Sequence, residues 1–387
     1  MYDSPIYLDY NATTPIDRRV RDCMMPYLFG AFGNPASNHT FGREAANAVE
    51  QARHHVARLV NAQPSEIFFT GSATESINLA MKGLAHSRQA VGQTIVASTA
   101  EHKAVLEVCR QLEEQMTVAY VPVTRPGNID LHELSRRAPM RRTLLVSLMA
   151  ANNEIGTIYP IREAAEIAHR SGALFFTDAT QAVGKIAVDV RAESVDLMAF
   201  SAHKLYGPKG VGALFVRGGR SKIALHPLIA GGGQEQGLRG GTLNVAGIVG
   251  FGEACRIAQE VMYDEAARLS RLRKLLEERL RSFSNVSVNG DSQYRLPNTT
   301  NLCFHGVEAT SLIREIGDVA VSTRSACSSQ AGDPSHVLKA IGLCDRCVCS
   351  SIRFSLGRFT TEDEIDETAR RITAALPRLR ASQAVRQ

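Results

Sequence analysis

The sequence predicts an α/β protein with a large domain built on a mostly parallel sheet and a smaller α+β domain. Short apolar runs alternate with segments of helical periodicity, a pattern typical of buried parallel strands that helices cover on both faces. After Gly252 the pattern changes to one long helical stretch followed by short strands. The 387 residues allow two domains, and 44% apolar with 21% charged residues is ordinary for a soluble globular protein.

The large domain is expected to contain buried strands with helices between them. The expected strands are 66–70, 94–97, 143–149, 173–177, 196–200 and 212–216. The expected helices are 43–60, 102–115 and 161–171. Gly172 follows the last of these helices, and glycine readily adopts the left-handed conformation that ends a helix.

The smaller domain is expected to start with the long helix, whose apolar stripe runs to about residue 283. Short strands are expected at 286–288, 300–304, 320–322 and 351–355, with a last helix from about residue 361. We assign residues 16–252 to the large domain, and residues 1–15 together with 253–387 to the small domain. A mobile loop is expected at about 322–336, because Ser, Gly, Asp and Pro are frequent there.

Charge and composition exclude several classes of protein. The formal charge of +5 is spread along the chain and is too small to indicate direct nucleic-acid binding. The N-terminus does not resemble a signal peptide and no apolar run is long enough to span a bilayer, so we expect no membrane association. Eight cysteines are too few for a disulfide scaffold. We expect a cytoplasmic protein with reduced thiols.

Two polar residues follow buried strands in an arrangement that suits one cofactor. Lys204 comes soon after strand 196–200, and Asp178 comes just after strand 173–177. Ligands of open α/β sheets bind at the carboxyl ends of the strands. Pyridoxal 5′-phosphate needs a lysine for its aldehyde and a carboxylate for its pyridine nitrogen. A single lysine is usually solvated and a single aspartate usually caps a helix, but the combination favours this cofactor.

The phosphate of such a cofactor needs N–H and O–H donors. Residues 71–74 (GSAT) join a strand to a helix, and small residues at a helix N-terminus let backbone N–H groups approach an anion. Ser201 and His203 flank Lys204 and offer further donors, while Asn153 follows another strand to the same edge. A P-loop motif is missing from the sequence, and its glycine-rich segments do not complete a dinucleotide-binding motif.

Ten segments, in order along the chain, resemble the NifS/IscS cysteine desulfurases, which are class-V aminotransferase-like enzymes of the fold-type I pyridoxal-phosphate group. The loop around Cys327 is similar to that of the long-loop branch, and the resemblance covers nearly the whole chain. The segments are YLDYNATTP (7–15), FGNPAS (32–37), FTGSATES (69–76), TAEHKAV (99–105), NNEIGT (152–157), DATQAVGK (178–185), SAHKLYGPKGVGAL (201–214), RGGT (239–242), SACSS (325–329) and SSIRFSLGRFTTEDEID (350–366).

The resemblance implies a homodimer and a role for each matching residue. Lys204 would bind the cofactor aldehyde, Asp178 the pyridine nitrogen, and His102 would stack on the ring. Arg353 and Asn153 would hold the substrate carboxylate, since a guanidinium pairs with two oxygens at once. Asn153 would also contact the cofactor. The other implied contacts are Gln181 with the ring hydroxyl, Ala73, Thr74, Ser201 and His203 with the phosphate, and Thr242 with the phosphate of the other subunit.

Cys327 lies among Ser, Gly and Asp in an expected loop, where a thiol without a function would be exposed to oxidation. The resemblance implies that Cys327 takes the sulfur of L-cysteine as a persulfide, that L-alanine is released, and that a sulfur-acceptor protein receives the sulfur. A mobile loop would allow Cys327 to move from the cofactor to the acceptor protein. His102 is the expected proton carrier, and as a metal ligand Cys327 would hold an iron–sulfur cluster only transiently.

The sulfur acceptor is left open by two departures from the family pattern. Arg324 stands where the family usually has a small residue, and the chain ends soon after its last helix. Iron–sulfur cluster assembly, nitrogenase cluster assembly, tRNA thiolation and DNA phosphorothioation are all open destinations. The alternative reaction is that of a selenocysteine or cysteine-sulfoxide lyase, which would need Lys204 but not Cys327.

The segment CDRCVC (344–349) is a weak signal for metal or redox chemistry. Its three thiols have no fourth ligand nearby in the sequence, so we interpret it as a loop before strand 351–355. A non-catalytic sulfur or metal carrier that uses these thiols is the alternative. The other cysteines outside the 325–329 segment are expected to pack in the core; they are Cys23, Cys109, Cys255 and Cys303.

Overall fold

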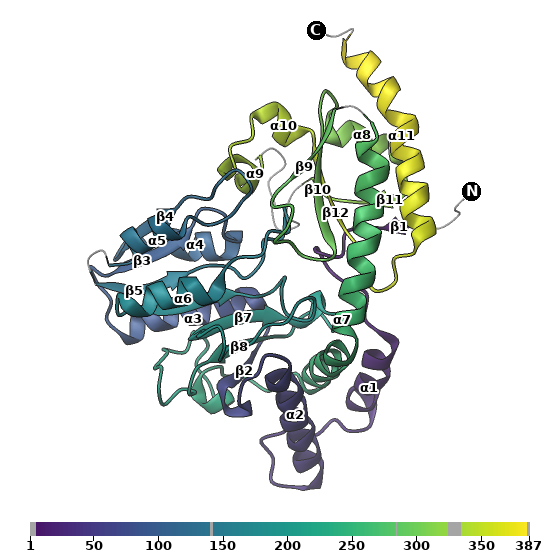
Figure 1. Ribbon diagram of the computed structural model, residues 1–387. Helices are drawn as coiled ribbons and strands as arrows, with labels where there is room; N and C mark the ends of the chain where they lie inside the picture. The colour runs from purple at the N-terminus through teal and green to yellow at the C-terminus, as the bar shows by residue number, and fades with distance from the viewer. Residues whose placement is uncertain (1–4, 140–141, 284, 324–333, 385–387) are drawn as a thin grey trace.

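A seven-stranded sheet with helices on both faces forms the larger part of the molecule (Figure 1). The computed structural model describes residues 5–139, 142–283, 285–323 and 334–384. In spatial order the strands are β2 (Ile67–Thr70), β8 (Gly212–Val216), β7 (Leu197–Ser201), β6 (Leu174–Asp178), β5 (Thr143–Ser147), β3 (Thr94–Ser98) and β4 (Thr117–Val121). The predicted α/β class with a mostly parallel sheet is confirmed.

One strand of this sheet runs against the others. Strand β8 is antiparallel to both β2 and β7, while β7, β6, β5, β3 and β4 are parallel to their neighbours. Strand β4 is absent from the predicted set. It lies at the sheet edge, where its first residues are exposed or half-buried, although residues 118–121 form a short apolar run like those of the interior strands.

The two faces of the sheet carry two separate cores because alternate residues of each strand point to opposite faces. Phe175 packs in a core that also contains residues of α2, α6 and α7. The next residue, Phe176, packs in a second core with residues of α3 and α4. Helices around the sheet are α1 (Arg18–Phe29), α2 (Thr40–Leu59), α3 (Ala73–Ser87), α4 (Lys103–Leu112), α5 (Leu131–Arg137) and α6 (Ile161–Arg170).

A smaller unit lies beside the large sheet and has its own core of apolar side chains (Figure 1). Its sheets have the orders β12-β10-β9 and β1-β11. The elements are β1 (Ile6–Tyr7), β9 (Val286–Asn289), β10 (Thr299–Phe304), α8 (Ala309–Ile316), β11 (Val319–Ala320), β12 (Ser351–Ser355) and α11 (Glu362–Ala384). Two short helices, α9 (His336–Ala340) and α10 (Asp345–Cys349), come between β11 and β12 in the chain.

Helix α7 (Val245–Arg281) connects the two units and begins earlier than expected. Gly252 lies inside this helix. A Cβ atom on Gly252 would come within 2.5 Å of the Cα of Ala52, so this glycine permits close packing of α7 on α2. The first part of α7 packs with the large core, and Leu269, Leu276 and their neighbours pack with the small one. The division at residues 252 and 253 therefore stays a proposal.

The segment CDRCVC is not a loop. Cys344 is the N-cap of α10, which runs to Cys349. Helices α9 and α10 pack with the large core through Val337, Leu338 and Val348. The described ranges contain no helix that is both long and apolar enough to cross a membrane.

Candidate active site

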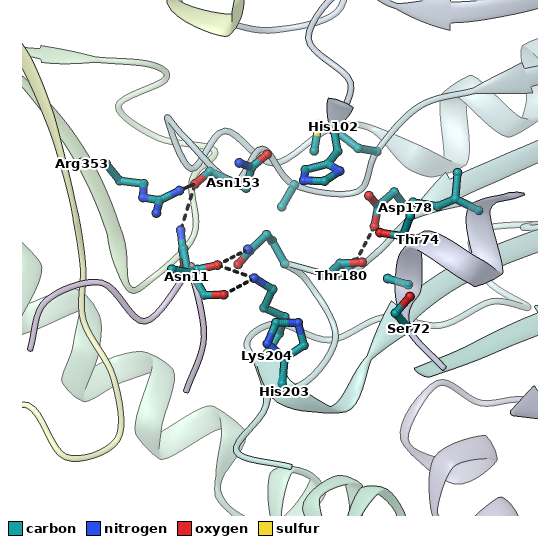
Figure 2. A pocket seen from close by; sticks show the side chains of 16 residues that line it. Asn11, Ser72, Thr74, His102, Asn153, Asp178, Thr180, His203, Lys204 and Arg353 are labelled. Atoms are coloured by element: carbon teal, nitrogen blue, oxygen red, sulfur yellow. Dashed lines mark hydrogen bonds between the residues drawn. The ribbon is translucent and has the colours of Figure 1, made fainter. Parts of the chain in front are cut away.

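An open cavity of about 710 Å³ lies at the carboxyl edge of the large sheet (Figure 2). It is lined by residues from the N-terminal segment, from the segments after β2, β3, β5, β6 and β7, from the start of α3, from the end of β6 and from β12. The lining residues are Asn11, Ala12, Ser72, Ala73, Thr74, Ile77, His102, Met149, Ala151, Asn153, Asp178, Thr180, Gln181, His203, Lys204 and Arg353. Nine of the residues predicted from the sequence are in this set.

Lys204 is the last residue of a short 3₁₀ turn (Ala202–Lys204) that directly follows β7. Its Nζ donates hydrogen bonds to the main-chain carbonyls of Asn11, at 2.7 Å, and Ala12, at 2.6 Å. These two carbonyls come from the segment after β1 and hold the amine at the cavity wall. Figure 2 shows Lys204 and His102 on opposite sides of the open centre of the cavity.

Residues 71–74 form the turn between β2 and α3, and its geometry is that of an anion cradle. Ser72 is the N-cap of α3 and its Oγ accepts from the N–H of Glu75 at 3.1 Å. Ala73 and Thr74 begin the helix, so their N–H groups have no partner within it. A Cβ on Gly212 would lie 2.6 Å from the carbonyl carbon of Ser72. Only a glycine there lets β8 pack this closely against the turn.

The turn is braced by one ion pair. Glu75 accepts from the N–H of Gly71 at 2.8 Å and from Nε of Arg239 at 3.0 Å. Arg239 belongs to the RGGT segment, which also contains Thr242. Thr242 itself is exposed and does not line the cavity. Its predicted contact with the other subunit therefore stays a prediction.

Asp178 and His102 define the middle of the cavity. Asp178 is the last residue of β6 and is buried, and one carboxylate oxygen accepts from the N–H of Thr180 at 3.0 Å. His102 is the N-cap of α4, where its Nδ1 accepts from the N–H of Ala104 at 3.1 Å. That bond leaves Nε2 as the nitrogen that carries the proton in the neutral ring.

Beside His102, a carboxyl group is fully buried. Glu101 accepts from the N–H of Met149 through Oε1 at 2.8 Å, and its Oε2 has no hydrogen-bond partner in the described part of the chain. Burial, together with the negative charge of Asp178, raises the pKa of Glu101 to about 8. The group is therefore mainly protonated at neutral pH.

Arg353 reaches the cavity from β12 and is 1% exposed. Its Nη1 donates to the carbonyl of Asn153 at 2.9 Å, and its Nη2 to Oδ1 of Asp9 at 2.7 Å. Its Nε has no hydrogen-bond partner among the described residues. A buried guanidinium with an unused donor fits a site for a carboxylate.

The charges around the cavity favour an anionic ligand. Burial, followed by the positive charges of Lys204, Lys209 and Lys185, lowers the pKa of His203 to about 4. Burial, followed by the charges of Lys204 and Arg353, lowers the pKa of Lys185 well below its ordinary value. A phosphate or carboxylate would relieve this mutual repulsion. The residues present therefore fit the cofactor that the sequence predicts.

Two further predicted residues lie in or near the cavity with their side chains already engaged. Gln181 donates from Nε2 to the carbonyl of Asn11 at 3.0 Å, and its Oε1 accepts from Lys185. Ser201 is buried, does not line the cavity, and donates to the carbonyl of Val211 at 3.3 Å. Their predicted cofactor contacts stay predictions.

Cys327 and Arg324 lie outside the described residues, but the segments on either side of them are placed. Ser322 exchanges backbone hydrogen bonds with Arg353, at 2.6 and 3.2 Å. On the other side, Ser335 donates to Glu154 at 2.5 Å and Nε2 of His336 donates to the carbonyl of Glu101 at 2.9 Å. Each end of the segment 324–333 is thus anchored next to a residue that lines the cavity.

The N-terminal segment contributes to the site, which the sequence pattern did not predict. Asn11 is 2% exposed and its amide joins several elements, because Nδ2 donates to the carbonyl of Asn153 at 3.2 Å and to Oγ1 of Thr299 at 2.8 Å. Its Oδ1 accepts from Lys185 at 3.2 Å. The available signal was the motif YLDYNATTP (7–15), which contains Asn11 and Ala12 but whose pattern says nothing of their spatial neighbours.

Comparisons with known proteins agree with this geometry. The family model for aminotransferase class-V matches residues 6–368. The cysteine desulfurase IscS of Salmonella paratyphi B is 51% identical over 381 residues, covering 97% of this chain and 94% of that protein. A solved NifS-like protein has a TM-score of 0.90 at 39% identity, covering 97% of this chain and 100% of its own. SspA in complex with cysteine has a TM-score of 0.81 at 35% identity, covering 92% of this chain and 100% of its own.

Proposed function

Because this chain belongs to the class-V aminotransferase family and is a cysteine desulfurase that uses pyridoxal 5′-phosphate, we propose that Lys204, His102 and Cys327 carry out its reaction. The observation that supports this assignment is the arrangement around one cavity. Lys204 and Asp178 follow or end adjacent strands, and His102 faces Lys204 across the open centre (Figure 2). A sulfur carrier without catalysis would not need this arrangement.

The cofactor would be held by groups on several elements. Lys204 would bind its aldehyde and Asp178 its pyridine nitrogen. The N–H groups of Ala73 and Thr74 would bind the phosphate at the start of α3, where the helix dipole favours an anion. Further contacts are assigned to Asn153, Gln181, Ser201 and His203, and to Thr242 across a homodimer interface. When bound, the cofactor draws electrons away from the substrate carbon next to the amino group.

L-cysteine would be oriented by its carboxylate. The unused Nε of Arg353 and the side chain of Asn153 support this assignment, and a charged hydrogen bond of this kind contributes about 1.5–3 kcal/mol. The substrate thiol would then lie toward the anchored ends of the 324–333 segment. We expect this orientation to determine which bond of the substrate is broken.

The sulfur transfer requires a thiolate on Cys327. This thiolate would form an S–S bond with the substrate sulfur while the substrate C–S bond breaks. The electron pair of that bond stays with the carbon fragment, which takes up a proton and leaves as L-alanine. We assign the proton movement to His102, whose Nε2 is the protonated nitrogen of the neutral ring.

The persulfide would leave the cavity on the 324–333 segment and react with an acceptor protein. Similarity to IscS supports an acceptor in iron–sulfur cluster assembly, and tRNA thiolation or DNA phosphorothioation are the alternatives. In this role Cys327 would ligate an iron–sulfur cluster only transiently. A homodimer in the cytoplasm is part of the same proposal.

Two variants test the assignment. In the wild type, borohydride should bleach the yellow colour and attach the cofactor covalently to Lys204. Lys204→Ala should show no such attachment, and should release neither alanine nor sulfide from L-cysteine. Cys327→Ser should keep the colour and lose sulfide release in the presence of a thiol reductant, while the matched control Cys349→Ser keeps both. Full sulfide release by Cys327→Ser would refute the persulfide role and favour a lyase.

A further inference from the structure

A second cluster of reactive side chains lies away from the cofactor cavity, where α10 packs against β10. Cys303 is a buried residue of β10, His305 follows that strand, and Cys347 is part of α10. The Nδ1 of His305 lies 3.6 Å from the Sγ of Cys303 and 3.9 Å from the Sγ of Cys347. The three atoms all lie within 4.8 Å of one another. Chain segments more than 40 residues apart in sequence thus supply three potential metal ligands.

The ring of His305 is held in the orientation that metal binding requires. Its Nε2 lies 2.9 Å from the Oγ of Ser287 on β9. If Nε2 donates to this hydroxyl, the lone pair of the neutral ring is on Nδ1, which is the nitrogen facing the two sulfurs. Histidine ligands in proteins are commonly fixed in this way by a hydrogen bond on the other nitrogen.

A fourth ligand is close to the cluster. The Sγ of Cys344, the exposed N-cap of α10, lies 3.1 Å from the Sγ of Cys347. In a tetrahedral zinc site with Zn–S of about 2.3 Å and Zn–N of about 2.0 Å, neighbouring ligand atoms are about 3.4–3.8 Å apart. The distances of 3.6 and 3.9 Å are near this range, whereas the 3.1 Å between the sulfurs of Cys344 and Cys347 is shorter. Cys344 does not belong to the group whose ligand atoms all lie within 4.8 Å of one another, so its exposed side chain would have to rotate toward the ion.

We propose that Cys303, His305, Cys344 and Cys347 bind one zinc-like divalent cation. This set of three cysteines and one histidine is typical of structural zinc sites. Binding would release the proton of each thiol, and three thiolates with one divalent cation leave a net charge of −1. Arg125 lines the same surface cavity and would offset this charge.

The competing interpretation is a redox-active dithiol made of Cys344 and Cys347. That interpretation accounts for the pair with the 3.1 Å separation. It does not account for the position of Cys303 or for His305, whose Nδ1 faces the buried sulfur as well as the half-buried one. The geometry therefore favours a metal ion over a disulfide.

The ion would join α10 to β10 in a part of the chain that borders the active site. Helix α9 follows the 324–333 segment directly, and β12, which carries Arg353, follows α10. A metal bridge would fix the connection between these two functional elements. Its role would be structural, so the test does not depend on the assignment of any catalytic residue.

Cobalt(II) is the probe, added to the reduced, full-length holoenzyme. We expect one equivalent per chain, with sulfur-to-cobalt charge-transfer bands and the strong ligand-field bands of tetrahedral cobalt, which zinc should displace. Cys303→Ser, His305→Ala and Cys347→Ser should each abolish or shift the ligand-field bands. Cys349→Ser, two residues further along α10, is the matched control and should keep them, as should Cys327→Ser.

A more selective variant addresses the orientation of the ring. Ser287→Ala removes the partner of His305 without touching a ligand, and we expect cobalt affinity to fall by about 10- to 100-fold. The circular dichroism spectrum and the cofactor absorbance show whether each variant has folded. Absence of cobalt uptake by the folded, reduced protein overturns the proposal. So does a Cys344–Cys347 disulfide found by mass spectrometry in metal-free protein from thiol-trapped cells.

Discussion

The Nζ of Lys204 donates a 2.7 Å hydrogen bond to the carbonyl oxygen of Asn11, a residue 193 positions earlier in the chain. The side chain of Asn11 is in turn bonded to residues of both units, among them Lys185 and Thr299. The position of the central amine therefore depends on the N-terminal segment, which the smaller core holds in place through Ile6 and Leu8.

Asn11→Ala should affect both stability and turnover. The change removes the hydrogen bonds of the Asn11 side chain to four partners. Lys185 and Asn298 each keep one other acceptor, and we expect the free energy of unfolding in urea to fall by about 2–3 kcal/mol. We also expect kcat for L-cysteine to fall by about 10- to 100-fold, because small displacements of reacting groups are costly. The exposed residue Asn38 provides the control Asn38→Ala. Wild-type kcat in Asn11→Ala would contradict the positioning role.

Arg353→Lys should weaken the binding of L-cysteine. Lysine keeps the charge but cannot pair with two carboxylate oxygens in the plane of a guanidinium. We expect KM to rise by about 10- to 100-fold, the loss that corresponds to one charged hydrogen bond, with a smaller change in kcat. Steady-state kinetics give both values. Arg314→Lys on the exposed face of α8 is the control, and an unchanged KM in Arg353→Lys would exclude the carboxylate site.

Glu101→Gln should change how stability depends on pH. Burial raises the pKa of Glu101 from an unfolded value near 4.5 to about 8, so between these values the folded state binds more protons than the unfolded state. The contribution of Glu101 to the free energy of unfolding is fully present below about pH 4.5 and is lost as the pH rises to about 8. The slope is at most about 1.4 kcal/mol per pH unit. We expect the free energy of unfolding, measured in urea from about pH 5 to about pH 8, to fall less steeply with pH for Glu101→Gln than for the wild type. Equal slopes for the two proteins would contradict the raised pKa of Glu101.

Glu235→Ala and Glu50→Ala should differ strongly although both residues pair with Arg53. Glu235 is buried and accepts from both terminal nitrogens of Arg53, at 2.9 and 2.8 Å. Its removal leaves the buried guanidinium with the exposed carboxylate of Glu50 as its only charged partner among the described residues, and takes the acceptor from the buried N–H of Phe69. We expect a loss of about 3–5 kcal/mol in the free energy of unfolding. Glu50 is exposed and pairs with Nε of Arg53 at 3.0 Å, so Glu50→Ala should cost at most about 1 kcal/mol. Similar losses of free energy of unfolding in the two variants would show that burial does not decide how much each ion pair stabilises the protein.

Local patterns predicted many elements closely. The strands expected at 212–216 and 351–355 coincide with β8 and β12. The first is a continuous apolar run and the second alternates polar with apolar residues, and both patterns are typical of strands. The antiparallel direction of β8 was not predicted, since an apolar run is the same for either direction. The start of α7 was missed because Gly252 suggested a boundary, whereas the close contact with Ala52 explains this glycine.

The chain's own order of strands, turns and helices determined that Lys204, Asp178 and the 71–74 turn would meet at one sheet edge, because parallel strands place their carboxyl ends together. Tertiary packing alone decided that Asn11 would hold Lys204 and that Cys303 and His305 would face Cys347. Periodicity and residue type report how each segment is buried locally. They carry no information on which distant segments become neighbours, since those contacts depend on how whole elements pack.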